Sequence, residues 1–131
     1  MTNHVGIVIV SHSAEISKGT ADMVYQMVGD SVPLSWCGGN SDGGLGSNYL
    51  EIKSAIEKVW NPAGVAVLID LGGTEANCEM AIEALPEDQR KLIAICDAPI
   101  VEGAVMAATE ASCGSPLTKV VETAEELSPK N

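Results

Sequence analysis

Positively charged residues and aromatic rings are scarce in this chain of 131 residues. Lys and Arg total seven against 18 Asp and Glu, for a formal net charge of −11, and aromatic residues make up 3% with no Phe at all. Modules that bind nucleic acids or anionic membranes present a basic surface, so this charge balance argues against both kinds of partner. With so few rings, the core must be built from Val, Ile, Leu, Ala and Met.

Long hydrophobic runs and metal-binding cysteine spacings are also missing. No stretch approaches the roughly 18 apolar residues of a membrane span. The first apolar run, 5–10, is too short for a signal peptide and has no basic residue before it. We therefore expect a cytoplasmic protein. The four cysteines form no CxxC pair, so we expect reduced, mostly buried thiols and no metal site.

Short apolar runs alternate along the chain with segments of helical periodicity. Runs 6–10, 65–70 and 92–96 are apolar without alternation, as is typical of parallel strands covered on both faces. The run 32–37 is a weaker candidate, whose Pro33 suggests an edge strand. The pattern predicts an α/β fold: a doubly wound, mainly parallel sheet of four to five strands with helices on both faces.

Helical periodicity also predicts which side chains form the core. The first helix, about 15–28, is predicted to turn four residues inward: Ile16, Met23, Val24 and Met27. Methionines on later helices, Met80 and Met106, are likewise expected to fill the core. One domain, 1–131, contains all the elements, and 127–131 is expected to be a flexible tail.

Polar residues cluster where two of the predicted strands end. The first strand ends at Ser11-His12-Ser13, and the run 65–70 ends at Asp70, with two glycines shortly after it. Ligands of parallel sheets bind outside these carboxyl ends. A carboxylate that accepts a hydrogen bond from one imidazole nitrogen leaves the other as a nucleophile, while glycine backbone and helix N-termini offer donors to an anion. The cluster therefore suits a phosphoryl group, or another small anion, placed on His12.

Plainer interpretations of the same residues remain open. His12 alone could be a loop residue, Asp70 could cap the next helix, and the glycine-rich segment 38–46 could be a simple connector. The chain has neither a P-loop nor the GxGxxG motif of dinucleotide-binding folds, so no nucleotide site of either kind is indicated.

Three segments together give the chain a family resemblance. They are VIVSHS (8–13), DLG (70–72) after an apolar strand, and APIVEG (98–103). On these motifs the chain resembles the DhaM family, the phosphotransferase subunits of phosphoenolpyruvate-dependent dihydroxyacetone kinases. That family is similar in fold to the mannose-type IIA proteins of the sugar phosphotransferase system. The resemblance covers nearly the whole chain.

The resemblance implies a phosphocarrier that has no cofactor or metal of its own. The protein HPr, itself carrying a phosphohistidine, would pass its phosphoryl group to His12. Phospho-His12 would then phosphorylate ADP held in the partner subunit DhaL, and the ATP formed there would phosphorylate dihydroxyacetone held by DhaK. The resemblance also implies a homodimer that works with the DhaK–DhaL complex.

The site residues follow from the same resemblance. His12 matches the phosphorylated histidine, and Asp70 matches the acidic residue that orients it. The phosphate-binding residues are expected to be Ser11, Ser13, Gly46, Ser47, Gly72, Gly73 and Thr74. The family often has Ser where this chain has Gly73, so Thr74 is expected to supply the hydroxyl. Two other functions remain open: a sugar-specific mannose-type IIA component, or an anion-binding regulatory module without turnover.

Overall fold

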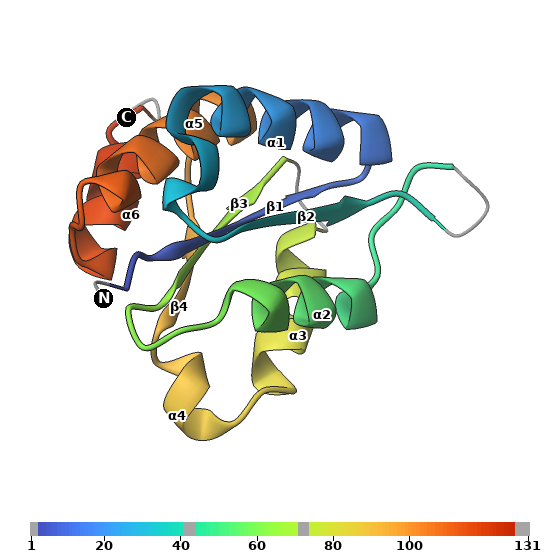
Figure 1. Ribbon diagram of the computed structural model, residues 1–131. Coiled ribbons are helices and arrows are strands. Elements are labelled where there is room, and N and C mark those ends of the chain that lie inside the picture. Colours follow the sequence, from blue (N-terminus) through green and yellow to red (C-terminus); the bar gives the residue numbers. More distant parts are fainter. Residues whose placement is uncertain (1–2, 41–43, 71–73, 128–131) are drawn as a thin grey trace.

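Four parallel strands form the sheet of this protein, for which a computed structural model describes residues 3–40, 44–70 and 74–127 (Figure 1). Within these ranges the strands are β1 (Gly6–Ser11), β2 (Leu34–Gly38), β3 (Val65–Ile69) and β4 (Ile93–Cys96). Their order across the sheet is β2-β1-β3-β4, and every neighbouring pair is parallel. The predicted parallel α/β fold is confirmed, and β2, directly after Pro33, is the predicted edge strand.

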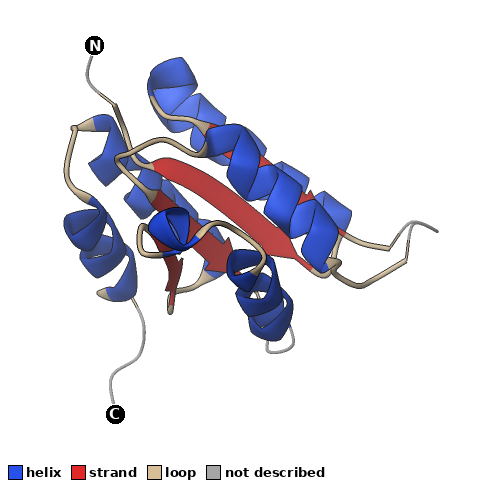
Figure 2. Ribbon diagram, turned by 90° about the horizontal axis from the view of Figure 1, so that it is seen from below, coloured by secondary structure: helices blue, strands red, loops and turns tan. Residues whose placement is uncertain are grey.

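Helices cover both faces of the sheet. They are α1 (Ala14–Val28), α2 (Tyr49–Val59), α3 (Thr74–Glu83), α4 (Glu87–Arg90), α5 (Ile100–Ser112) and α6 (Leu117–Glu125), with a 3-10 turn, η1 (Gly29–Ser31). Helices α1, α5 and α6 pack on one face, and α2 and α3 pack on the other (Figure 1, Figure 2). In the described part of the chain, no helix combines the length and apolar character needed to cross a membrane.

The central strand β1 shows why the sheet needs both helical layers. Ile7 and Ile9 belong to the core beneath α1, α5 and α6, whereas Val8 and Val10 belong to the core beneath α2 and α3. All four side chains are fully buried. Because alternate residues of a strand project to opposite faces, a strand that is apolar at every position must be covered twice. Each such side chain contributes about 1.5–3 kcal/mol on burial.

The strand order places a switch point between β1 and β3. From β1 the chain crosses through α1 to β2 on one side, while β3 pairs with β1 on the other side. The register pairs Val10 with Ile69, so His12 and Asp70 emerge from adjacent strand ends at the same edge of the sheet. Open parallel sheets bind ligands in the crevice at such a reversal.

The prediction that helical methionines fill the core is wrong. Four of them have exposed fractions between 39 and 66%: Met23, Met27, Met80 and Met106. Ile16 is 47% exposed as well, so Val24 is the one member of the predicted inner face of α1 that is buried.

Small residues occupy the inner face of α1 in their place. Ser17 and Thr20 are buried there. Thr20 Oγ1 donates to the carbonyl oxygen of Ile16 at 2.7 Å, and Ser17 Oγ donates to that of Ala14 at 3.1 Å. Because each hydroxyl finds a carbonyl acceptor within its own helix, neither is buried unsatisfied. Hydrophobic periodicity cannot detect such a face in full, since two of its four buried residues, Ser17 and Thr20, are polar by type.

Two neighbouring residues of α1 provide a test of this arrangement. Val24 is fully buried and Met23 is 52% exposed. We expect Val24→Ala to lower the free energy of unfolding by about 2 kcal/mol, because it removes buried methyl groups and leaves a cavity. Met23→Ala should change that free energy by no more than about 0.5 kcal/mol. Urea unfolding followed by circular dichroism measures both, and a larger loss for Met23→Ala would contradict the observed burial.

Candidate active site

The candidate site lies at the carboxyl edge of the sheet, where two strands end and two helices begin. His12 lies between β1 and α1, and Asp70 lies directly after β3. Thr74 is the first residue of α3. Ser13 is the N-cap of α1, and its Oγ accepts a hydrogen bond from the backbone N–H of Ile16 at 3.3 Å. The positive ends of two helix dipoles thus meet beside the histidine, which favours an anion there.

The carboxylate of Asp70 joins these elements. Its Oδ2 accepts hydrogen bonds from Ser11 Oγ at 2.7 Å and from the backbone N–H of His12 at 2.9 Å. Its Oδ1 lies 3.2 Å from His12 Nδ1 and accepts from Thr74 Oγ1 at 3.0 Å. The sequence-based pairing of His12 with Asp70 is therefore present in the structure, together with two hydroxyls that hold the carboxylate.

The hydrogen bonds around His12 determine which imidazole nitrogen carries the proton. Nδ1 lies 2.9 Å from Thr74 Oγ1 as well as 3.2 Å from Asp70 Oδ1. Because Thr74 gives its own proton to Asp70, both neighbours present acceptors to Nδ1, and the proton belongs on Nδ1. Among the described residues no partner binds Nε2, and 29% of the His12 side chain is exposed. Nε2 therefore retains a lone pair that is available to an incoming group.

The hydroxyls of Ser11 and Thr74 are used within this network. Both residues are fully buried, and both donate to Asp70. Ser11 Oγ also accepts the backbone N–H of Ser13 at 3.0 Å. These contacts position the His–Asp pair, so in this state neither hydroxyl proton is directed at an anion. The phosphate-binding role expected for Ser11, Ser13 and Thr74 stays a prediction.

The loop before α2 lies against the backbone of His12. Gly46 donates its N–H to the carbonyl oxygen of His12 at 2.8 Å, and its own carbonyl accepts the N–H of Gly39 at 2.8 Å. Gly46 has φ +155°, and a Cβ at this position would collide with the Asn40 side chain. Gly46 is thus held against the backbone of His12, and Ser47 follows it directly in the chain, whereas Gly72 and Gly73 lie outside the described residues.

Asn77 is a site residue that the sequence analysis missed. Its Nδ2 donates to Ser47 Oγ at 2.6 Å and lies 3.5 Å from the Ser47 carbonyl oxygen. Asn77 follows Thr74 by three residues on α3, so the two share one face of the helix. The three-residue spacing between Thr74, where the helix begins, and Asn77 is the feature of the sequence that could have identified Asn77.

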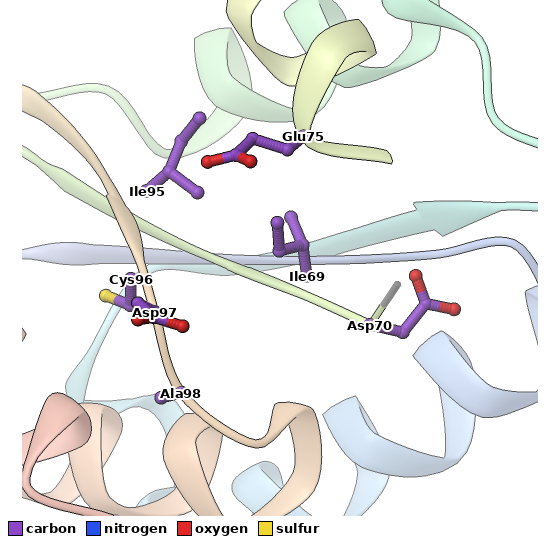
Figure 3. A pocket seen from close by; sticks show the side chains of 7 residues that line it. All are labelled: Ile69, Asp70, Glu75, Ile95, Cys96, Asp97 and Ala98. Carbon is purple, nitrogen blue, oxygen red and sulfur yellow. The ribbon is translucent and has the colours of Figure 1, made fainter. Parts of the chain in front are cut away.

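A cavity of about 400 Å³ lies beside Asp70, at the carboxyl ends of β3 and β4 (Figure 3). Its lining residues are Ile69, Asp70, Glu75, Ile95, Cys96, Asp97 and Ala98. Figure 3 shows Asp70 at the end of β3, with Glu75 and Asp97 placed around the same space. Three carboxylates make this space unfavourable for a phosphate, so an anion fits better on the loop side of His12.

The four cysteines are free, as expected, but two of them rather than most of them are buried. Cys78 and Cys96 are buried, Cys37 is partly buried and Cys113 is exposed. Burial raises the pKa of Cys37, Cys78 and Cys96 to about 12. In the ranges that the structure covers, no group of three or more His, Cys, Asp or Glu side chains is arranged to hold a metal ion.

The fold and the His–Asp pair at the switch point agree with the phosphotransferase class that the motifs of the sequence resemble. The chain matches the family model described as "PTS system fructose IIA component" over residues 6–121. Since this match spans most of the chain, the protein belongs to that family of phosphotransferase system (PTS) proteins.

The similar proteins within the family include DhaM subunits. The chain is 39% identical over 106 residues to the phosphoryl donor subunit DhaM of PEP-dependent dihydroxyacetone kinase 2 from Listeria innocua, covering 81% of this chain and 85% of that one. It is 32% identical over 120 residues to DhaM of Escherichia coli, covering 89% of this chain but 25% of that longer protein. A crystal structure of a protein of unknown function, EF1359, has 35% sequence identity and a TM-score of 0.79 over 97% of both chains. The resemblance to DhaM is confirmed.

The environments of the cysteines predict a selective reaction in the native protein. Because the thiolate is the reactive form, a pKa near 12 leaves Cys37, Cys78 and Cys96 almost unreactive near neutral pH. We expect iodoacetamide to modify the exposed Cys113 first, and all four cysteines once urea unfolds the chain. Peptide mass spectrometry locates the modified residue, and early modification of Cys78 in the native protein would contradict its burial.

Proposed function

We propose that this protein carries a phosphoryl group on Nε2 of His12 and serves as the phosphoryl donor subunit of a dihydroxyacetone kinase. The observation that carries the proposal is the bonding of Nδ1 to Asp70 and Thr74, which leaves Nε2 unprotonated at a partly exposed position. The names of the similar DhaM subunits support the pathway. The phosphoryl donor we propose is phospho-HPr, and the acceptor is ADP bound in the partner subunit DhaL.

The transfer of the phosphoryl group onto His12 requires no gain or loss of a proton at Nδ1. The Nε2 lone pair attacks the phosphorus of the donor phosphohistidine, the nitrogen–phosphorus bond of the donor breaks, and its electron pair returns to the donor imidazole. Positive charge develops on the His12 ring as the new bond forms. Asp70, 3.2 Å from Nδ1, stabilises that charge. Because the transition state of phosphoryl transfer is loose, alignment and hydrogen-bond donors supply most of the rate.

The second transfer needs an acceptor held by another protein. An oxygen of the ADP β-phosphate attacks the phosphorus, and the bond to Nε2 breaks to regenerate neutral His12 and form ATP. Arg90 is the one arginine of the chain, and it ends α4, ahead of β4. It therefore lies at the amino end of the sheet, opposite His12. With a net charge of −11 as well, the chain itself offers free ADP little attraction.

The acceptor distinguishes dihydroxyacetone kinase from sugar transport. The protein, phosphorylated by enzyme I, HPr and phosphoenolpyruvate, is mixed with free ADP, with ADP-loaded DhaL, or with a sugar-specific IIB protein. The proposal expects rapid loss of the phosphoryl group with ADP-loaded DhaL only. Rapid transfer to the IIB protein instead would assign the chain to sugar transport, and equal rates with free and bound ADP would contradict the need for a partner.

His12→Ala tests the position of the phosphoryl group, with His4→Ala as the matched control. His4 is the other histidine, and its Nδ1 lies 2.8 Å from the carbonyl oxygen of Ala111, away from the site. After incubation with the donor proteins, intact-mass spectrometry should show one added phosphate on the wild type and on His4→Ala, and none on His12→Ala. Phosphate on His12→Ala would refute the assignment.

Asp70→Asn and Thr74→Val test the hydrogen bonds that fix the tautomer. In Asp70→Asn an amide nitrogen can face Nδ1 of His12, and Nδ1 must then accept a hydrogen bond instead of donating one. The proton of the imidazole therefore moves to Nε2, which loses the lone pair that makes it a nucleophile. We expect phosphorylation to slow by about 10²–10⁴-fold, as for orienting carboxylates in other enzymes. Thr74→Val should slow phosphorylation by about tenfold, the effect expected from the loss of one hydrogen bond, and Thr74→Ser should keep the wild-type rate. Phosphorylation rates are measured by rapid quench. A wild-type rate in Asp70→Asn would contradict the orienting role of Asp70 and reduce it to a helix cap.

A further inference from the structure

Ser47 is held from two directions at the edge of the candidate site. The preceding residue, Gly46, is bonded to the backbone of His12 at 2.8 Å. From the other side, Asn77 on α3 reaches Ser47 Oγ with its amide nitrogen at 2.6 Å. The same nitrogen lies 3.5 Å from the Ser47 carbonyl oxygen, which can only accept a hydrogen bond, so the nitrogen rather than the oxygen of the amide faces Ser47.

This contact determines what the Ser47 hydroxyl can still do. A serine hydroxyl has one proton to donate and lone pairs that accept. The Asn77 bond occupies a lone pair and leaves the proton. Among the residues with described positions, no acceptor takes that proton, and Ser47 is partly exposed. The hydroxyl is therefore prepared to donate to a group that arrives from solvent.

We propose that Asn77 is a positioning residue that prepares the Ser47 hydroxyl to donate a hydrogen bond to the phosphoryl group carried by His12. The inference rests on the proposed phosphocarrier function and assigns a role to a residue outside the His–Asp pair. Ser11 and Thr74 donate their hydroxyl protons to Asp70. Among the described residues Ser13 and Ser47 both keep an unused hydroxyl proton, and Ser47 is the one whose oxygen is held by a side chain of another element, Asn77. A donor aligned beforehand costs no reorganisation as negative charge on the phosphoryl oxygens approaches.

An amide and a carboxylate at position 77 give opposite directions to the hydrogen bond with Ser47: the amide of Asn77 donates to the hydroxyl, whereas a carboxylate would accept from it. Asn77→Asp keeps the size of the side chain but offers only acceptors, so Ser47 turns its proton toward residue 77 and away from the phosphoryl group. Asn77→Ala removes the contact without an alternative acceptor. Ala76→Asp is the control for charge, because Ala76 is the exposed preceding residue of α3.

The experiment measures the rate at which phosphoramidate, a small phosphoryl donor, phosphorylates His12 in each variant. In this reaction the phosphorus–nitrogen bond of phosphoramidate breaks, its nitrogen leaves as ammonia after protonation, and the bond to Nε2 forms. We expect Ser47→Ala and Asn77→Asp to be slower by about 10-fold, the loss of one hydrogen bond to a charged group. Asn77→Ala should be slower by a smaller factor, and Ala76→Asp should remain within about 2-fold of the wild type. Circular dichroism and urea unfolding establish that each variant is folded.

A double variant separates a positioning role from a structural one. If Asn77 acts through Ser47, then Asn77→Ala added to Ser47→Ala should change the rate no further. Additive losses, or wild-type rates in both Asn77 variants, would overturn the role of Asn77 while leaving the phosphocarrier proposal intact. A wild-type protein that accepts no phosphoryl group, from phosphoramidate or from phospho-HPr, would instead refute the proposed function itself.

Discussion

The carboxylate of Asp70 is the interaction on which the candidate site depends. It accepts hydrogen bonds from the Ser11 hydroxyl, the His12 backbone and the Thr74 hydroxyl, and it pairs with Nδ1 of His12. Only 12% of its side chain is exposed, and a carboxylate shielded from water to this degree needs such donors to remain charged. One group thereby joins the ends of β1 and β3 to the start of α3 and sets the tautomer of the histidine.

The charge distribution fits the proposed transfer of a phosphoryl group, which the site would have to release again. Three lysines of the chain pair with carboxylates on their own helices: Lys18 with Asp22, Lys53 with Glu57, and Lys119 with Glu122. Among its described residues the site offers two helix N-termini and hydroxyl groups, rather than a clamp of cations. An anion held by dipoles alone is bound less tightly than one held by arginines, which suits the proposed carrier of a phosphoryl group between two partners.

Burial within the layers depended on residue size as much as on hydrophobicity. The apolar runs of β1 and β3 predicted doubly covered strands, because a strand that is apolar at every position leaves no face for water. The inner face of α1 was mispredicted because Ser17 and Thr20 satisfy their hydroxyls within the helix and can therefore be buried against the sheet. Met23 and Met27 then remain on the outer surface, although their type suggested the core.

The sequence by itself determined the α/β class, the edge position of β2 and the pairing of His12 with Asp70, because apolar runs and strand-end residues are local features that the geometry of a parallel sheet brings together. Only the tertiary structure decided the roles of the hydroxyls: Ser11 and Thr74 donate to Asp70, whereas Ser47 accepts from Asn77. A hydroxyl can donate in several directions, and its choice depends on acceptors that lie distant in the chain, such as Asp70 for Ser11. The tautomer of His12, and with it the nitrogen that we propose as the nucleophile, follows from that same choice.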